Sequence, residues 1–355
     1  MARDGVGAWY AVVITALGRP GLASCLRALA ESSGPGPVRV VLVDDRPRTG
    51  GAPLSTFVPR SLRSRTTVVR GGGRGPAAAR NTGWRAAGRV PWIVFLDEDV
   101  IPGPTWADDL VLDLAETTDD TAGSTARVHV PLPVDRRPTD WERTAACLTA
   151  ARWVTADMAY RRAALESVAG FDERFRHAFR EDADLAFRVL DAGWTLTEGG
   201  RSTTHSPHPP DRWASVRLQA GNADDVLMTR LHGRDWWHHA DPLWGRLPGH
   251  LAVTAAGAVT VACAVLGRPR AAMACATAWL TGTAEFALSR IRPGPRTRDE
   301  IITVTLTSAL VPPTATWHWL RAQITHPLHP PHPTTGAHHA DRRNQGDRRP
   351  RGAAV

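Results

Sequence analysis

Short apolar runs alternate with helical patterns over the first hundred residues. The runs of strand length cover 9–16, 38–43, 66–69 and 91–96. Helical periodicity lies between them, around Leu22, Leu26 and Leu29 and again over 76–87. Uninterrupted apolar runs are typical of strands that are buried on both faces, and their alternation with helices predicts a parallel sheet with crossover helices. The predicted fold class is therefore α/β.

The pattern is mainly helical from residue 100 to residue 237. Residues 119–138 lack a clear period and are predicted to be irregular or an edge strand. A loop that contains histidines is expected over 203–210, after a strongly amphipathic helix. The helices predicted in this part of the chain cover 106–115, 141–151, 161–169, 180–192 and 213–231.

The composition changes after Trp237. Three apolar segments follow, over 250–266, 271–288 and 301–320, each at or below the roughly 20 residues that span a bilayer. Two interpretations stay open: a helical appendage packed on the main domain, or a helical hairpin on or in a membrane. The Pro-, His- and Arg-rich end of the chain is predicted to be disordered. The predicted organisation is a main domain over 1–237, the appendage over 238–322 and the tail over 323–355.

The charge of the chain is basic but uneven. There are 43 basic and 35 acidic residues, a net charge of +8, and every basic residue is arginine. The absence of lysine excludes a lysine Schiff-base enzyme and a Walker-A phosphate loop. Half of the excess lies in 321–355, with six arginines and two aspartates. A nucleic-acid partner is therefore not expected.

The cysteines and the first residues indicate the compartment. The four cysteines form no CxxC pair, which indicates reduced thiols. The first ten residues contain no apolar signal core, so secretion is not expected. The predicted location is the cytoplasm, at the inner face of the cell membrane if the appendage contacts lipid.

The most informative motif is IVFLDEDV, at the end of the fourth predicted strand. In an extended chain Asp97 and Asp99 point to the same side, where two carboxylates suit Mg²⁺ or Mn²⁺ and a diphosphate. The plain alternative is a solvated acidic turn. A haloacid-dehalogenase-type phosphatase also begins with such a motif, and Asp224 and Asp225 would then serve as its later acidic pair. That motif usually follows the first strand, whereas three strands precede it here.

Three further motifs place charged side chains at the ends of predicted strands or at the starts of predicted helices. The string VVLVDD places Asp44 and Asp45 at a strand end, where a carboxylate can accept hydrogen bonds from a base or ribose. The glycine-rich string at 71–88 opens a helix near Arg80, which favours an anionic group. In FREDADLAFRVLDAGW, a carboxylate of the first helical turn is a candidate general base. Asp184 and Arg188 are spaced to form a structural ion pair.

Taken in order, these motifs resemble a family-2-like glycosyltransferase with the GT-A fold. The resemblance covers 9–205 and includes VVITALGRP, VDD, ARNTGWRAAG, FLDEDV, TADMAYRRAALESVAGFDERF and REDADLAFRVLDAGW. It implies a GT-A Rossmann-like nucleotide-diphospho-sugar transferase fold with a C-terminal helical appendage. The stretch 218–234 has no counterpart in the family pattern.

The resemblance also implies a role for each matching residue. Thr15 and Arg19 would line the nucleotide pocket, and Asp44 and Asp45 would contact base and ribose. Arg80 would lie near the nucleotide or diphosphate, and Asp97 near the ribose or the donor sugar. Asp97 and Asp99 would bind the metal, with His205 as third ligand and His208 as its competitor, and a histidine that only stabilises the loop is the remaining alternative. Asp182 would be the catalytic base, with Glu181 as the alternative, and Asp157 would lie near the acceptor entrance.

The activity implied is metal-dependent, inverting transfer of a sugar from a nucleotide-diphosphate donor to an acceptor hydroxyl. The cofactor would be Mn²⁺ or Mg²⁺, and the acceptor a glycan, a lipid or a small molecule. A different class of protein is also considered: a non-catalytic nucleotide-binding scaffold of the same fold. The complete set of Asp97, Asp99 and Asp182 argues against a scaffold.

Overall fold

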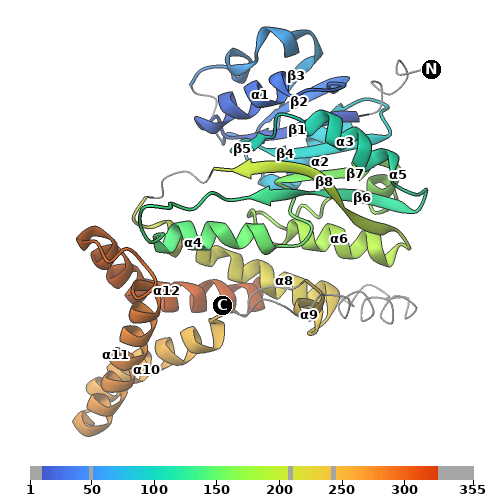
Figure 1. Cartoon of the computed structure of the whole chain (residues 1–355). Helices are drawn as coiled ribbons and strands as arrows, with labels where there is room; N and C mark the ends of the chain where they lie inside the picture. The colour runs from blue at the N-terminus through green and yellow to red at the C-terminus, as the bar shows by residue number, and fades with distance from the viewer. Residues whose placement is uncertain (1–9, 48–50, 207–210, 241–244, 327–355) are drawn as a thin grey trace, which may run out of the picture.

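The computed structural model describes residues 10–47, 51–206, 211–240 and 245–326. Within them, one eight-stranded sheet has the order β3-β2-β1-β4-β7-β6-β8-β5 (Figure 1). Strands β1 to β4 are parallel where they pair, and β7 runs antiparallel to β4 and β6. The strands are β1 (Tyr10–Ala16), β2 (Arg39–Asp44), β3 (Thr66–Arg70), β4 (Trp92–Asp97), β5 (Val100–Pro102), β6 (Thr121–His129), β7 (Asp157–Arg161) and β8 (Thr195–His205).

The first four predicted strands are confirmed, and their apolar alternation supplies two cores. Tyr10, Val12 and Ile14 of β1 pack on one face with α1 (Gly21–Glu31) and α3 (Trp106–Ala115). Ala11 and Val13 face the other side, against α2 (Pro76–Ala86), α5 (Arg162–Ser167) and α6 (Glu181–Asp191). Successive strand residues point to opposite faces, so a fully apolar strand is buried by helices on both. The protein thus has a three-layer α/β/α body.

The second half of the sheet differs from the prediction. Residues 121–129 form β6, which lies between β7 and β8 instead of being irregular or at the edge. Strand β7 was not predicted, and β8 occupies residues 195–205, so it includes the start of the expected histidine loop. These strands contain many small and polar residues, and their positions depend on pairing with neighbours.

The helix expected over 213–231 is interrupted. The structure contains α7 (Ala214–Arg217), a 3₁₀ turn (Leu218–Gly221) and α8 (Asn222–His232), followed by α9 (Trp236–Ala240). A Cβ added to Gly221 would lie 2.7 Å from the Phe179 ring, so this position admits only glycine without a shift. Glycine also weakens a helix. Helix α4 (Asp140–Ala146) begins with a capping box between Thr139 and Glu142 and continues into a 3₁₀ turn (Cys147–Ala150).

The apolar C-terminal segments are helical, as predicted. Helices α10 (Leu247–Val265) and α11 (Pro269–Ile291) form a hairpin that projects away from the sheet, and α12 (Arg298–Thr325) returns toward α8 (Figure 1). Arg230 of α8 donates to Gln323 of α12 at 2.8 Å. In the part of the chain described, α10 is the one helix long and apolar enough to cross a membrane. Helix α12 extends to Thr325, so residues 323–325, predicted as the start of the tail, are helical. From 327 onward the predicted tail lies outside the described residues.

Candidate active site

Arg80 joins the end of β4 to the start of α6. Its Nη2 donates to Asp97 at 3.0 Å and its Nη1 donates to Glu181 at 2.7 Å. The guanidinium is 4% exposed and lies 5.6 Å from the centre of the Phe171 ring. Burial alone would lower the pKa of Arg80, but Asp97 and Glu181 outweigh burial and raise it above the ordinary value. Arg80 therefore stays charged and fixes two carboxylates, and its expected place near the nucleotide or diphosphate stays a prediction.

Helix α6 presents two adjacent carboxylates beside Arg80. Glu181 is buried, and desolvation raises its pKa to about 7, with the nearby Asp182 adding to the shift. Asp182 is half-buried and accepts from the backbone N–H of Ala183 at 2.8 Å. Desolvation also raises the pKa of Asp182. No described side chain forms a salt bridge with Asp182, so of the two carboxylates it is the one open to an incoming hydroxyl.

Asp99 and His205 meet where β5 pairs with β8. His205 Nε2 lies 3.5 Å from Asp99 Oδ1, and Ser206 donates its backbone N–H to the Asp99 carbonyl. The Nδ1 atom of His205 is buried with no hydrogen-bond partner. Over residues 10–47, 51–206, 211–240 and 245–326, no three His, Cys, Asp or Glu side chains converge on one metal position. The pair of a carboxylate and an imidazole fits a cation whose other ligands come from substrate and water. His208 lies outside the described residues.

Glu98, between the two aspartates, has a role that the sequence did not indicate. It accepts backbone N–H bonds from Leu17, Gly18 and Arg19 at 3.0–3.1 Å and is buried. Desolvation raises the pKa of Glu98 above its ordinary value. Glu98 thus fixes the turn after β1, which carries Arg19. Thr15 pairs with Asp97 across β1 and β4, and Arg19 lies 3.7 Å from Glu98. Thr15 and Arg19, the two residues predicted to line the nucleotide pocket, therefore lie beside the strand-end carboxylates.

The acidic pair after β2 mainly holds protein groups. Asp44 forms a two-point ion pair with Arg46, with bonds of 2.8 and 2.7 Å, and this bonding lowers the pKa of Asp44. Asp45 accepts the backbone N–H groups of Gly73, Arg74 and Gly75 at 2.9–3.3 Å. Asp45 is therefore the anchor of the glycine-rich loop, a role that differs from the expected ribose contact.

Asp157 lies in the protein interior, not at an acceptor entrance. It is fully buried in β7 and accepts from Trp106 Nε1 at 2.6 Å, Thr203 Oγ1 at 2.6 Å and Arg201 Nε at 2.9 Å. Arg201 is also fully buried and pairs with Asp113 at 2.9 Å. Both oxygens of Asp157 are committed to protein donors, which corrects the expected position. Nothing in the sequence around Arg201 marked it as a buried residue.

The unassigned stretch 218–234 contacts the loop that precedes α6. Asp225 accepts from Arg180 Nε at 2.8 Å, and Asp224 lies 2.9 Å from His177 Nδ1. Arg180 has a φ of 72° and stacks on Phe179 and on Trp236 of α9. The two aspartates of α8 thus clamp the turn from which Glu181 and Asp182 begin, instead of joining Asp97 and Asp99 as the phosphatase alternative requires.

The predicted ion pair of α6 is present. Asp184 is buried, binds Arg188 at 2.7 Å and also contacts His232 of α8 at 2.8 Å. It therefore stabilises the helix that carries the candidate base.

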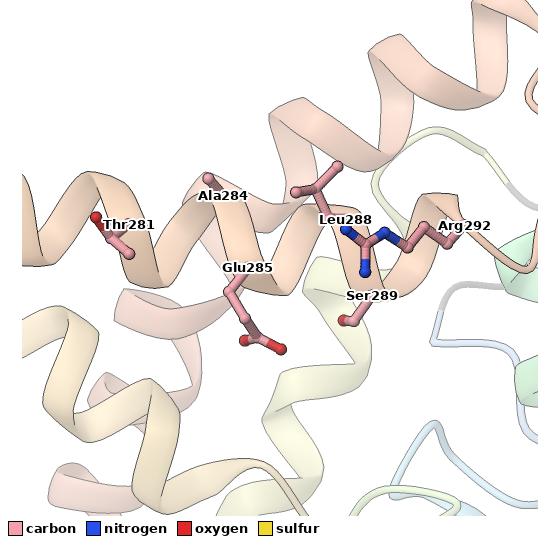
Figure 2. A pocket seen from close by; sticks show the side chains of 6 residues that line it. All are labelled: Thr281, Ala284, Glu285, Leu288, Ser289 and Arg292. Atoms are coloured by element: carbon pink, nitrogen blue, oxygen red, sulfur yellow. The ribbon is translucent and has the colours of Figure 1, made fainter.

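One groove of about 400 Å³ lies elsewhere. Figure 2 shows that its lining side chains come from the C-terminal half of α11 and from Arg292, which follows that helix. They are Thr281, Ala284, Glu285, Leu288, Ser289 and Arg292. It belongs to the projecting hairpin and shares no residue with the carboxylate cluster.

The comparisons with known proteins concern the same part of the chain. Residues 11–181 match the family described as Glycosyl transferase family 2, a span that includes Arg80, Asp97, Asp99 and Glu181. Two relatives, from Mycobacterium tuberculosis strains CDC 1551 / Oshkosh and ATCC 25618 / H37Rv, are described as pre-mycofactocin glycosyltransferase. Each is 34% identical over 137 residues, or 35% of this chain and 28% of the relative. The match thus spans little more than a quarter of those relatives.

A solved structure shares the fold over most of the length. The mannosyltransferase PcManGT from Pyrobaculum calidifontis, in complex with GDP-Man and Mn²⁺, superposes with a TM-score of 0.53 and 16% identity. The superposition covers 90% of this chain and 88% of that one. At this identity the likeness concerns the fold alone.

Proposed function

Residues 11–181 form a family 2 glycosyltransferase domain of GT-A fold, and from this premise we propose that the enzyme transfers a sugar from a nucleotide-diphosphate donor to an acceptor hydroxyl with inversion. The order of the sequence motifs predicted this family. The observation that carries the proposal is the Arg80 bridge, which brings Asp97 at the strand end to the helix turn that presents Asp182.

The reaction we propose is a single displacement. Asp182 takes the proton of the acceptor hydroxyl, and the acceptor oxygen forms its bond to the anomeric carbon. The bond from that carbon to the diphosphate breaks, and its electron pair leaves with the diphosphate. The raised pKa of Asp182 suits a general base, because a carboxylate with a higher pKa accepts a proton more readily. One displacement from the opposite face inverts the anomeric centre.

The donor side of the site has the groups that a diphosphate needs. Asp99 and His205 would hold Mn²⁺ or Mg²⁺, which when bound would supply positive charge to the leaving diphosphate. The Mn²⁺ in the mannosyltransferase complex supports this choice. Because the chain has no lysine, other phosphate contacts fall to arginine and backbone N–H groups. Thr15 and Arg19 would line the proposed nucleotide position, whereas Asp44 and Asp45 are committed to Arg46 and to the glycine-rich loop.

The proposed acceptor is a hydroxyl of a glycan, a lipid or a small molecule, and the proposed location is the cytoplasm, at the inner face of the cell membrane. The four cysteines are free thiols, as expected in a reducing compartment. The apolar C-terminal helices support the membrane contact.

A nucleotide-sugar panel tests the function. The full chain is incubated with UDP- and GDP-sugars and Mn²⁺, and both thermal stabilisation and slow donor hydrolysis are measured. Asp182→Asn is expected to lower turnover by about 10²–10⁴-fold and to keep the donor-induced stabilisation, because it removes only the base. Asp99→Asn is expected to lose the Mn²⁺-dependent part of the stabilisation. Asp211→Asn, at an exposed ion pair with Arg217, is the matched control.

Three results would contradict the proposal. Full turnover by Asp182→Asn would show that Asp182 is not the catalytic base. Release of phosphate from simple esters without any response to nucleotide sugars would favour the phosphatase. Donor binding with no turnover under any condition would favour the scaffold.

A further inference from the structure

The α10–α11 hairpin is solvent-exposed over most of its length in the part of the chain that the structure describes. Over residues 251–284, all of which the structure describes, no side chain is buried. The buried residues of the two helices lie at the root, namely His250, Phe286 and Ala287. Figure 1 shows the two helices projecting together from the rest of the molecule. The hairpin is therefore an apolar element that the rest of the described chain leaves uncovered.

Charges mark both ends of the hairpin. None lies between Arg246 and Arg268 on α10, nor between Arg270 and Glu285 on α11. The 19 residues of α10 extend over about 28 Å, close to the ~30 Å hydrocarbon thickness of a bilayer. Arginines thus stand at the tip and at the root of an apolar band. In a helix that packs on protein, by contrast, charges normally occupy the outer face along its whole length.

Helix α12 continues the same surface. Its outward face carries large apolar side chains at helical spacing: Ile302, Leu306, Leu310, Trp317, Leu320 and Ile324. The opposite face, with Val304, Val311 and Ala315, is buried. The exposed fraction of Trp317 is 62% and that of Ile324 is 84%. An exposed apolar stripe of this length is unusual for a surface in water and marks an interaction site.

The groove of Figure 2 lies near the root of the hairpin. It combines apolar Ala284 and Leu288 and charged Glu285 on one face of α11 with Arg292, the residue that follows the helix. Arg246 pairs with Glu285, and Arg290 pairs with Asp140 of the main domain. The root is thus the boundary between the apolar hairpin and the polar body.

We propose that the α10–α11 hairpin and the outward face of α12 form one membrane-binding surface, whose partner is a lipid bilayer with anionic headgroups. The hairpin inserts, and α12 lies in the boundary between headgroups and acyl chains, with Trp317 at the depth that tryptophan prefers. Residues 245–326 contain eight arginines and three acidic residues, which complement anionic lipid and disfavour a second copy of the same surface. This surface shares no residue with the site proposed for the transfer reaction.

The native cysteines provide the first test. Cys263 and Cys275 lie in the hairpin, whereas Cys147 is exposed on the main domain and serves as internal control. The full chain is treated with a water-soluble maleimide, with and without vesicles of phosphatidylcholine and phosphatidylglycerol. Vesicles are expected to slow labelling of Cys263 and Cys275 by about tenfold or more and to leave Cys147 unchanged, since hydrocarbon excludes the reagent. Equal labelling of all three with and without vesicles would overturn the proposal.

Flotation with the same vesicles tests the surface by substitution. Val261→Asp with Leu266→Asp is expected to lower vesicle affinity by about 100-fold, because a carboxylate enters hydrocarbon at high cost. Trp317→Glu is expected to lower it by about tenfold. Leu112→Asp is the matched control, since Leu112 is also 62% exposed but lies on α3 of the main domain, and it is expected to float like the unmodified chain.

Other outcomes identify other occupants. A stable dimer in solution whose Cys263 and Cys275 are protected without vesicles would show that a second copy covers the surface, and would overturn the proposal. Equal affinity for vesicles without phosphatidylglycerol would overturn the role of the arginines. Because flotation needs no nucleotide sugar, its result is independent of the proposed function.

Discussion

Arg80 shows how one side chain can organise a site from the interior. A buried charge is tolerated when opposite charges and hydrogen bonds compensate it, and Asp97 and Glu181 do both. The planar guanidinium directs separate N–H groups at each carboxylate, which the single ammonium of lysine cannot match. Arg80 thus couples the strand-end carboxylate to the turn of the candidate base.

Replacing this guanidinium tests the coupling. Arg80→Lys is expected to lower the free energy of unfolding by about 2–4 kcal/mol, since one buried carboxylate loses its partner. Urea denaturation would measure the change. Arg85→Lys is the control, because Arg85 is half-exposed and its oxygen partner on Glu173 is 3.6 Å away, and it should cost at most about 0.5 kcal/mol. Equal stabilities of the two variants would contradict the bridge.

The raised carboxylate pKa values predict the pH dependence of turnover. A carboxylate with a raised pKa keeps its proton to higher pH, and a base works only without that proton. Turnover is therefore expected to rise with pH through a midpoint above the ordinary aspartate pKa of 3.8, because desolvation raises the pKa of Asp182. Glu181→Gln should lower that midpoint, since Arg80 would then face Asp182 without a competing carboxylate. A pH–rate profile with an ordinary midpoint would contradict the expectation.

At the scale of elements, α8 contacts the turn that precedes α6 and thereby positions the start of that helix. The φ of 72° at Arg180 is an uncommon conformation for a residue with a side chain, and the ion pair with Asp225 and the stacking on Trp236 hold it there. Asp225 is therefore a positioning residue for Asp182. This contact explains a stretch of sequence for which the family pattern has no counterpart.

Removing the charge of Asp225 should separate positioning from binding. Asp225→Asn is expected to lower kcat by about tenfold and to leave the donor KM unchanged. The turn that carries Asp182 would be held less firmly, whereas the residues proposed to bind the donor would keep their contacts. Asp225→Glu should recover part of the loss. Steady-state kinetics with the donor identified by the panel would measure both. A change confined to KM would place Asp225 in substrate binding instead.

The glycine-rich loop is the second element that tertiary contacts fix. Gly75 has a φ of 100°, and an added Cβ would lie 2.5 Å from the carbonyl oxygen of Arg176. Gly193 has a φ of 92° with open space around it. Gly193→Ala is expected to lower the free energy of unfolding by about 1–2 kcal/mol through backbone strain alone. Gly75→Ala is expected to lower it by clearly more, because the added Cβ also clashes with the Arg176 carbonyl. Chemical denaturation of both variants would check the order, and equal losses would contradict the crowding.

At the scale of the whole molecule, charge and apolar surface are divided between two bodies. The α/β body carries paired acidic and basic groups around one site, whereas the C-terminal helices expose apolar side chains between arginines. The net charge of +8 therefore describes no single surface. The part of this charge that bears on binding is carried by the arginines at the ends of the hairpin, and these fit an anionic bilayer better than a nucleic acid.

The sequence by itself determined the elements whose own residues are apolar enough to show that they are buried or contact an apolar partner. Strands β1, β2 and β4 are apolar on both faces, and α10 is apolar throughout, so each was predictable from local pattern. Strand β8, by contrast, contains one leucine among eleven residues, and its place in the sheet comes from pairing with β6 and β5. Local pattern cannot predict a strand whose burial depends on its neighbours.

The same division holds for the site. The motifs marked Asp97, Asp99 and the Glu181–Asp182 turn, because a polar residue after a buried strand or at a helix start is visible in the sequence. Only the tertiary structure decided that Asp157 is enclosed, that Asp45 and Glu98 hold loops, and that Arg80 reaches a partner 101 residues away. The physical reason is that a carboxylate's role depends on the donors and the solvent around it, and those donors come from distant parts of the chain.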